Sequence, residues 1–276
     1  MASRPISPAR RARRPKTIPV RKIGGGDLDR SLSEGWRDFM DMRGDIIFLA
    51  LLYPLIGIVA AVLSVGSPLL PLFLPIAAGV GLLGPVAAVG FYEMARRREM
   101  GLTSNWAHFL DVRKRPSFEE IASVSGLLLA IFGLWLFAAG ALYVALFGWH
   151  YTQSVVEFLR EIFTTGRGWA LMVIGGAVGA VFAAVVLAVS VVSMPMLVDC
   201  EASASDAVRT SIRAVRENPG PMLRWGILVA VLLIAGSIPL FIGLAVVLPW
   251  LGYSTWHLYT RLVDRSAIPA RKRRRD

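Results

Sequence analysis

The sequence predicts an all-α fold, a polytopic membrane helix bundle with six transmembrane helices and short interfacial amphipathic helices. Two observations predict it. Of the 276 residues, 55% are apolar and 18% are charged, whereas a soluble domain is about 25% charged. The mean hydropathy is +0.58 although the net charge is +11. This combination excludes an ordinary soluble nucleic-acid-binding protein and a disordered chain, and it fits a membrane protein with basic ends.

The N-terminal stretch, residues 1–30, is rich in Arg, Pro, Ser and Gly, and the run Gly24–Gly26 interrupts local order. We therefore predict a disordered basic tail. The first apolar run begins at Ile46, behind a basic stretch that lacks the short apolar core and the cleavage site of a signal peptide. The first hydrophobic helix is accordingly expected to stay in the membrane as an uncleaved span.

Four apolar blocks follow, and a helix needs roughly 20 residues to cross the hydrocarbon core. The first and fourth blocks are divided by Gly66-Ser67-Pro68 and by Gly236-Ser237-Ile238-Pro239, sequences that favour turns, so each block is interpreted as a helical hairpin. The second begins after Ser117 and Glu120, a spacing typical of a capping box. The six predicted spans cover about residues 46–65, 70–92, 121–149, 169–198, 222–237 and 239–260, within a membrane domain of residues 31–262 that precedes a basic C-terminal tail, residues 263–276.

Charge placement favours six spans over five. With six spans, 28 of the 30 Lys and Arg residues lie on one side of the membrane, and the other side holds Arg160 and Arg167. Cytoplasmic loops carry an excess of basic residues. Five spans would place the basic cluster 271–275 outside, so we predict that both termini are cytoplasmic.

Amphipathic stretches precede the first, third and fifth spans, and a fourth lies in the predicted outer loop. Each places apolar side chains opposite charged ones, as an interfacial helix does. Each even-numbered span carries a proline, at Pro85, Pro195 and Pro249. The pattern suggests a weak threefold repeat, although plain duplication of a hairpin produces it too. The apolar faces comprise Leu32, Trp36, Phe39 and Met40; Trp106, Phe109 and Leu110; Val208, Ile212 and Val215; and Val155, Phe158, Leu159 and Ile162.

The spans lack the residues that carry chemistry in other membrane proteins. The four apolar blocks, residues 46–92, 121–149, 169–198 and 225–259, contain no Asp, Glu, Lys or Arg. A proton relay, a charged-substrate carrier and a voltage sensor each need such residues within the membrane. Under this topology His108 and His257 lie on one side and His150 on the other, and Cys200 is the single cysteine, so neither a metal site nor a disulfide is expected. No nucleophile or phosphate-binding motif occurs. We predict no catalytic residue, no cofactor and no metal, and therefore no enzyme.

Two arginine-rich clusters are the candidate contact residues. They would touch anionic headgroups, at about 1 kcal/mol per basic residue near the surface, or would serve mainly to fix the topology. We favour the second role as the main one. Nucleic acid is not expected as a partner, because no folded basic surface or stacking aromatic accompanies the tails. The clusters are Arg96, Arg97 and Arg98, and Arg271, Lys272, Arg273, Arg274 and Arg275.

The connection between the fourth and fifth spans carries the clearest helix signals. Ser203 is placed to cap a helix, with Asp206 favourable in its first turn, and Asn218-Pro219-Gly220-Pro221 ends it. One interpretation is a coupling or docking helix. The other, which we favour, is an amphipathic connector that lies on the membrane.

Three segments of the chain carry a family resemblance: Ser193-Met-Pro-Met-Leu-Val-Asp199, the run from Ala207 through Asn218-Pro219 to Trp225, and the ending from Gly243 through Pro249, Tyr253 and Trp256-His257 to Tyr259. The segment Gly35-Trp36-x-Asp38-Phe39 fits as well. Over about residues 20–262 the chain resembles an uncharacterised bacterial family of predicted integral membrane proteins, domain of unknown function 2189. The resemblance implies a multi-pass protein of the bacterial inner membrane and carries over no catalytic residue. Some members are labelled as cytochrome c oxidase proteins, but this chain has no suitably placed histidines within its spans for haem and copper.

Three functions remain open. The first is a non-enzymatic protein of membrane organisation, assembly, or contact with lipid or a partner. The second is a transporter or channel for a neutral or amphipathic solute, which a water-accessible cavity lined by Ser64, Ser125, Ser190 or Tyr143 would favour. The third is an accessory protein of a respiratory oxidase complex. We favour the first, with anionic headgroups on the cytoplasmic side and an unidentified membrane protein as partners.

Overall fold

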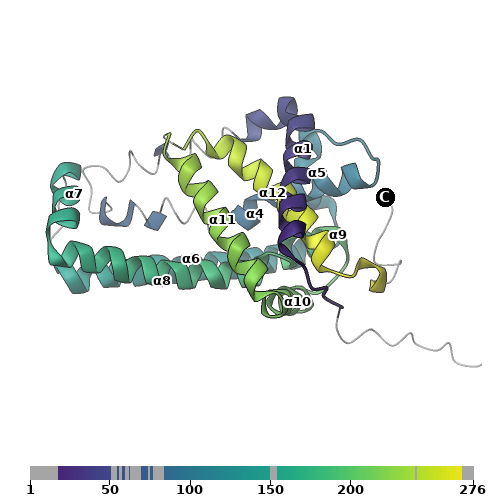
Figure 1. Cartoon of the computed structure of the whole chain (residues 1–276). Helices are drawn as coiled ribbons and strands as arrows, with labels where there is room; N and C mark the ends of the chain where they lie inside the picture. The colour runs from purple at the N-terminus through teal and green to yellow at the C-terminus, as the bar shows by residue number, and fades with distance from the viewer. Residues whose placement is uncertain are drawn as a thin grey trace, which may run out of the picture.

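The computed structural model describes residues 18–50, 55, 58–59, 62, 70–73, 75–76, 84–149, 154–239 and 241–268, and the side chains of residues 43–50 and 106 are not described. Within these ranges the chain is helical and forms no β-strand, which confirms the predicted all-α class. A long hairpin of α6 (Phe118–Phe147) and α8 (Gly166–Ser190) ends in α7 (Val155–Thr164) on one side and in a cluster of helices on the other (Figure 1).

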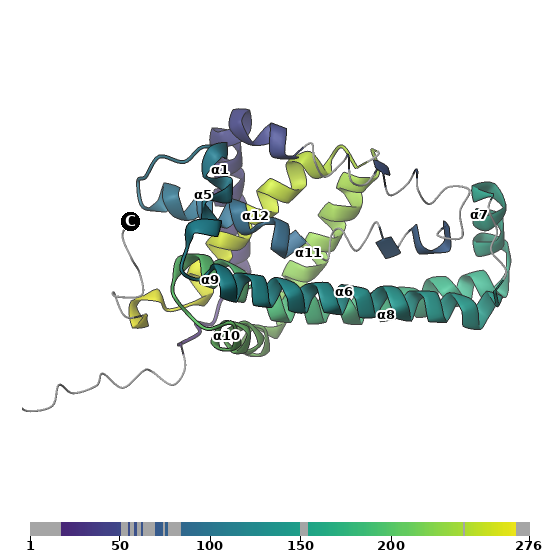
Figure 2. The same ribbon diagram turned by 180° about the vertical axis from the view of Figure 1, so that it is seen from behind.

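We call the cluster of helices opposite α7 the head. From it α11 (Pro219–Ser237) leads away at an angle to the α6–α8 hairpin, and α12 leads back into it (Figures 1 and 2). Short elements η1 (Leu70–Leu72) and α4 (Gly84–Ala87) precede α5 in the chain. The head is formed by α1 (Gly25–Ala50), α5 (Val89–Glu99), η2 (Trp106–Lys114), α9 (Ser193–Asp199), α10 (Ala204–Glu217), α12 (Leu244–Leu262) and η3 (Arg265–Ala267).

Three helical segments are long and apolar enough to cross a membrane. They are Phe118–Phe147, Gly166–Asp199 and Pro219–Ser237, and they coincide with the predicted third, fourth and fifth spans. The predicted total of six spans is not confirmed, nor is the threefold repeat. Most of the predicted first span and part of the second lie outside the described residues. The predicted sixth span, α12, is not one of the three membrane-capable segments.

The far end of the hairpin carries the amphipathic helix predicted for the outer loop. In α7, Phe158 and Ile162 are buried, and Phe158 packs beside Tyr143 of α6. Val156 and Phe163 on the same helix remain exposed. An amphipathic helix with exposed apolar residues at the end of a membrane-capable hairpin is typical of an interfacial helix.

The predicted fourth span is broken near its head end. Pro195 has no N–H to donate to the carbonyl of Val191, so the helix cannot run on regularly. Accordingly α8 ends at Ser190 and α9 begins at Ser193. The amide of Val192 at this break donates to Ser211 Oγ of α10 at 3.1 Å, and both groups are buried. The break is therefore stabilised from a neighbouring helix.

Helix α1 packs along α12, and the contact is closest at Gly35. A Cβ atom on Gly35 would lie 2.2 Å from Ser254 Oγ and 2.5 Å from Ser254 N, so only glycine permits this approach. Helix α1 begins at Gly25, inside the stretch 1–30 that was predicted as a disordered tail. The predicted boundary at residue 30 is therefore wrong for residues 25–30, because the glycines here begin a helix that α12 stabilises; residues 1–17 lie outside the described part.

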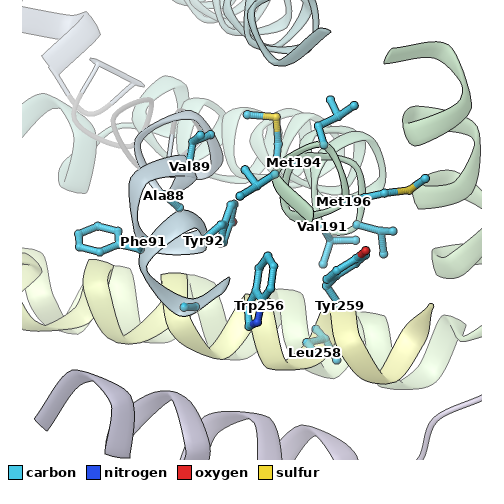
Figure 3. Packing of buried hydrophobic residues seen from close by; sticks show 14 of the residues in the cluster. Ala88, Val89, Phe91, Tyr92, Val191, Met194, Met196, Trp256, Leu258 and Tyr259 are labelled. Carbon is cyan, nitrogen blue, oxygen red and sulfur yellow. The ribbon is translucent and has the colours of Figure 1, made fainter. Parts of the chain in front are cut away.

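The core of the head lies between α5, α9 and α12. All seven residues of α9 are buried. Figure 3 shows side chains of all three helices in this region: Phe91 and Tyr92 of α5, Met194 and Met196 of α9, and Trp256 and Tyr259 of α12. These side chains belong to one apolar cluster, and burying each large one contributes roughly 1.5–3 kcal/mol.

Elements around this core differ from the prediction in two places. Helix α5 continues to Glu99, beyond the predicted end of the second span at residue 92. Helix α12 begins at Leu244 rather than near 239, after a turn in which Phe241 has φ of 64°. The predicted interfacial residue Phe109 packs edge-on against Phe91, with ring centroids 5.1 Å apart.

The predicted caps of α10 are confirmed, and the predicted capping box of α6 is wrong. Ser203 Oγ accepts from Asp206 N, and α10 ends at Glu217 before Asn218. Ser117 makes no cap hydrogen bond to α6 and instead donates from Oγ to Leu197 O at 2.6 Å. Glu120 reaches across to accept from Ala204 N of α10 at 2.6 Å. Both side chains therefore bond to other helices instead of capping α6.

Candidate functional site

The head gathers most of the buried charge of the described residues. Glu93, Arg96 and Asp199 are among its buried charged residues. No group of three or more His, Cys, Asp or Glu side chains in the described part is placed to hold a metal ion. The charged side chains instead form three clusters around α5 and α12, which we call together the head charge network.

The first cluster is centred on Glu93 of α5. The carboxylate accepts two hydrogen bonds from Arg96, at 2.9 and 2.8 Å, and one from Arg115 Nη1 at 2.8 Å. The spacing of Glu93 and Arg96 puts both on one face of the helix. Arg97 lies 3.4 Å from Asp111, whose pKa is lowered chiefly by its hydrogen bond to Lys114.

The second cluster joins α9, α12 and η3 around Asp199. Its carboxylate accepts from Tyr259 Oη at 2.9 Å and from Arg265 Nε and Nη2 at 3.0 and 3.2 Å. Arg265 also donates to Glu99, which accepts from Trp256 Nε1 as well. Burial alone would lower the pKa of Arg265, but the charges of Asp199 and Glu99 raise it overall. The guanidinium therefore stays charged at any physiological pH.

The third cluster lies where α1 meets α12 and α5. His257 Nε2 is 2.8 Å from Asp38 Oδ2, and Nδ1 is 3.2 Å from Glu34 Oε2. Arg261 Nη2 donates to Glu34 at 2.7 Å. Arg98 of α5 pairs with Asp38 at 3.0 Å and with Asp41. Both nitrogens of the imidazole therefore face carboxylates.

These clusters are arranged to hold helices together. Every carboxylate named in them has a cationic partner, and breaking a buried pair by removing one partner costs about 3–5 kcal/mol. The imidazole of His257 lies between the carboxylates of Asp38 and Glu34. Cys200 is buried, and its Sγ donates to Met196 O within α9. The geometry of these clusters fixes the positions of the helices that carry them.

Two of the residues named for a solute pathway lie in packed surroundings. Ser190 Oγ donates to Val186 O of its own helix, and Tyr143 stacks on Phe147 with ring centroids 5.0 Å apart. Ser64 lies outside the described residues. A shallow groove of about 490 Å³ is found elsewhere, between α1 and α12, lined by Asp29, Leu32, Ser33, Trp36 and Trp250.

The predicted contact arginines of α5 point into the network. The side chain of Arg96 is 4% exposed and is held by Glu93, whereas Arg98 is 36% exposed and pairs with α1. The cluster Arg271–Arg275 lies outside the described residues. His150 does too, and His108 serves its own element by accepting from Asn105 N through Nδ1 at 3.3 Å. A headgroup contact of either arginine cluster stays a prediction.

Sequence reasoning did not foresee the carboxylate partners of the network. Their signal was nevertheless present, because Asp38, Asp199 and His257 all fall in the segments that carry the family resemblance. The fold brings those segments together: Gly35 and Asp38 meet Ser254 and His257, and Asp199 meets Tyr259. The sequences of the separate segments do not show which of their residues pair in the folded protein.

Comparison with known proteins agrees with the resemblance. Residues 72–199 match the family model described as "Predicted integral membrane protein (DUF2189)", which confirms the predicted resemblance to that family. The match covers a shorter part of the chain than residues 20–262, over which the resemblance was predicted. No curated protein and no solved structure matches the chain. The chain is thus similar to a family of predicted integral membrane proteins whose function is unknown.

Proposed function

We propose that the protein is a multi-pass protein of the bacterial inner membrane that works without catalysis, as an organising or docking protein with its head on the cytoplasmic side. The observation that carries this proposal is the head charge network. Its charged side chains pair with one another across six helical elements, and these pairs hold the surface of the head in one conformation.

The exposed surfaces of the membrane-capable helices and of the head support this proposal. The membrane-capable helices expose large apolar side chains, including Phe137 of α6, Val173 of α8 and Ile234 of α11. Such surfaces suit lipid or another membrane helix. The head exposes charged residues around a closed core, which suits an aqueous interface.

The test is site-specific photocrosslinking in the native membrane. A photoreactive residue at Phe137, which is 74% exposed on α6, is expected to give lipid adducts. A photoreactive residue at Trp36 on the head, 38% exposed, is expected to give a discrete protein adduct identifiable by mass spectrometry.

A matched control places the same photoreactive residue at Leu128, which is 1% exposed within the core and should give intramolecular products only. If Trp36 gives no protein adduct in native membranes while Leu128 behaves as expected, the docking role is contradicted. Recovery of an oxidase subunit at Trp36 would make the protein an accessory of a respiratory complex instead.

A further inference from the structure

We infer that the groove between α1 and α12 is the docking face of the head, and that it receives an acidic amphipathic helix of a partner protein. The inference rests on the proposed function, the docking role of the head, and adds to it the place of docking and the chemistry of the partner. The groove is lined by Asp29, Leu32, Ser33 and Trp36 of α1 and by Trp250 of α12. The four residues of α1 are spaced as i, i+3, i+4 and i+7, so they share one face of the helix.

The walls of the groove are two indole rings in fixed positions. The rings of Trp36 and Trp250 meet edge to face, with centroids 5.1 Å apart and an interplanar angle of 71°. Trp250 Nε1 donates to Leu32 O at 3.0 Å, so the polar atom of this indole has its partner within the protein. Trp36 also packs against the buried ring of Phe39, with centroids 5.5 Å apart. The two indoles therefore offer an incoming apolar side chain a large contact area, and tryptophan is enriched among the residues that dominate binding energy.

The packing of α1 on α12 holds the two walls at a constant separation. The closest contact between these helices, Gly35 against Ser254, directly precedes Trp36 in the chain. Ser254 lies one turn after Trp250, and its Oγ donates to Trp250 O at 2.7 Å. A groove that is already formed before binding loses little conformational entropy when a partner binds. It therefore suits a partner that inserts side chains between the indoles without moving the helices.

The rim of the groove is basic. Arg30 and Arg37 are exposed on α1, and each is next in sequence to a residue that lines the groove. Arg224 of α11 reaches one end of the groove, where its Nη2 lies 2.8 Å from Asp29 Oδ1. Three guanidinium groups against one carboxylate leave an excess of positive charge. The complementary surface of a partner is therefore anionic, because complementary potentials favour association.

The acidic residues between positions 30 and 42 of α1 do not offset this charge. Asp38 and Asp41 pair with Arg98 of α5, and Glu34 accepts from Arg261 of α12. Each of these carboxylates therefore has a cationic partner in the head charge network, which leaves Arg30 and Arg37 to act on an approaching partner.

A protein helix fits this surface better than a lipid or a second copy of this chain does. An amphipathic helix inserts apolar side chains at i, i+3 or i+4, and i+7 into a groove, and acidic residues on its flanks reach a basic rim. The groove lies on the head, which the proposed function places at an aqueous interface, so a lipid chain would have to leave the bilayer to enter it.

The chemistry of the chain itself argues against a second copy as the occupant. The exposed face of α10 carries Arg209 and Arg216, which a basic rim repels. Helix α7 is amphipathic and carries Glu157 and Glu161, but it lies at the opposite end of the α6–α8 hairpin (Figure 1). We therefore assign the groove to a different protein.

The experiment places a photoreactive amino acid at Ser33, which is exposed and lines the groove, in the full-length protein in its native membrane. Crosslinked peptides are identified by mass spectrometry. Copies labelled with heavy isotopes are mixed with unlabelled copies, so that a crosslink between two copies of this chain is recognised. The expected result is one protein adduct, formed to a peptide that has apolar residues at helical spacing and glutamate or aspartate beside them.

The decisive variant reverses the charge of the rim with Arg30→Glu and Arg37→Glu together. Because like charges across an interface oppose association, the yield of the Ser33 adduct should fall about tenfold. The matched control is Arg209→Glu with Arg216→Glu, two exposed arginines on α10 that have the same spacing along their helix. The control makes the same change in net charge and should leave the yield unchanged. The melting temperatures of both double variants establish that each is folded.

The outcomes separate this inference from the docking role itself. If neither Trp36 nor Ser33 gives a protein adduct, the docking role fails and the inference fails with it. If Trp36 gives a protein adduct, but Ser33 gives none or its yield is unchanged by the reversal of Arg30 and Arg37, docking stands and the groove is not its site. An equal loss of yield in the control variant also overturns the role of the rim. A basic crosslinked peptide, a lipid adduct or a crosslink between two copies overturns the choice of occupant.

Discussion

Single residues set how closely α1 and α12 approach, and Gly35 is the strictest of them. Its missing Cβ allows the backbone of Ser254 to lie against the α1 backbone. This contact places Asp38, one turn later, beside His257. Gly35 has ordinary helical backbone angles, so glycine is needed there because no room exists for a side chain.

We predict that Gly35→Ala destabilises the protein by about 1–3 kcal/mol, the usual cost of overpacking. Alanine at Gly26, where no atom lies within 4 Å of the added Cβ, is the matched control in the same helix and should be neutral or slightly stabilising. Thermal unfolding in detergent, followed by tryptophan fluorescence, measures both. Equal melting temperatures for the two variants would contradict the predicted contact.

Glu34 links the stability of the head to pH. Burial alone would raise the pKa of Glu34, but its hydrogen bond to Arg261 and the charges of Arg261, His257 and Arg37 lower it overall. A carboxyl group with a lowered pKa in the folded state binds fewer protons there than in the unfolded state. Its stabilisation is complete above the unfolded pKa, about 4.3, and disappears as the pH falls through the folded value.

We therefore expect the melting temperature of the protein to fall on acidification below about pH 4, and Glu34→Gln to reduce this dependence. The measurement is the melting temperature as a function of pH, with the exposed Glu119→Gln as control. A steeper acid loss in Glu34→Gln than in the unmodified protein would refute the sign of the effect.

At the scale of elements, helix ends are completed by neighbouring helices. Glu120 of α6 caps α10 through Ala204 N, and Ser211 of α10 satisfies Val192 N at the break between α8 and α9. Unpaired buried amides cost about 1–3 kcal/mol each. These two hydrogen bonds between helices fix the positions of α6, α9 and α10 relative to one another.

We predict that Glu120→Ala lowers stability by about 1 kcal/mol, as the loss of a helix cap does. Hydrogen exchange should rise specifically at the first turn of α10. Glu119→Ala removes the same charge from the neighbouring position and should change neither quantity. The prediction is contradicted if the exchange rates of α10 amides are the same in Glu120→Ala and Glu119→Ala.

At the scale of the whole molecule, the α6–α8 hairpin separates α7 from the head. We therefore predict that α7 and the head lie on opposite sides of the membrane. A reporter fused after Asp276 should report the cytoplasm. A cysteine at Val156, which is 77% exposed on α7, should react with an impermeant maleimide added from outside, and Ser205→Cys should not. The basis is the excess of Lys and Arg at the head end. A reporter fused after Asp276 that reports a location outside the cytoplasm would contradict this topology.

The sequence by itself determined the class of the protein and its apolar helices. Hydropathy and helix signals act within one segment, so the predicted spans agree with α6, α8 and α11 at their starts to about one turn, and Ser203 and Asn218 bound α10 as predicted. The tertiary structure alone decided which segments meet. The pairing of Asp38 with His257 spans 219 positions, and Ser117 and Glu120 left their local cap for partners on other helices. Such contacts depend on distances between elements, which no local pattern in the chain encodes.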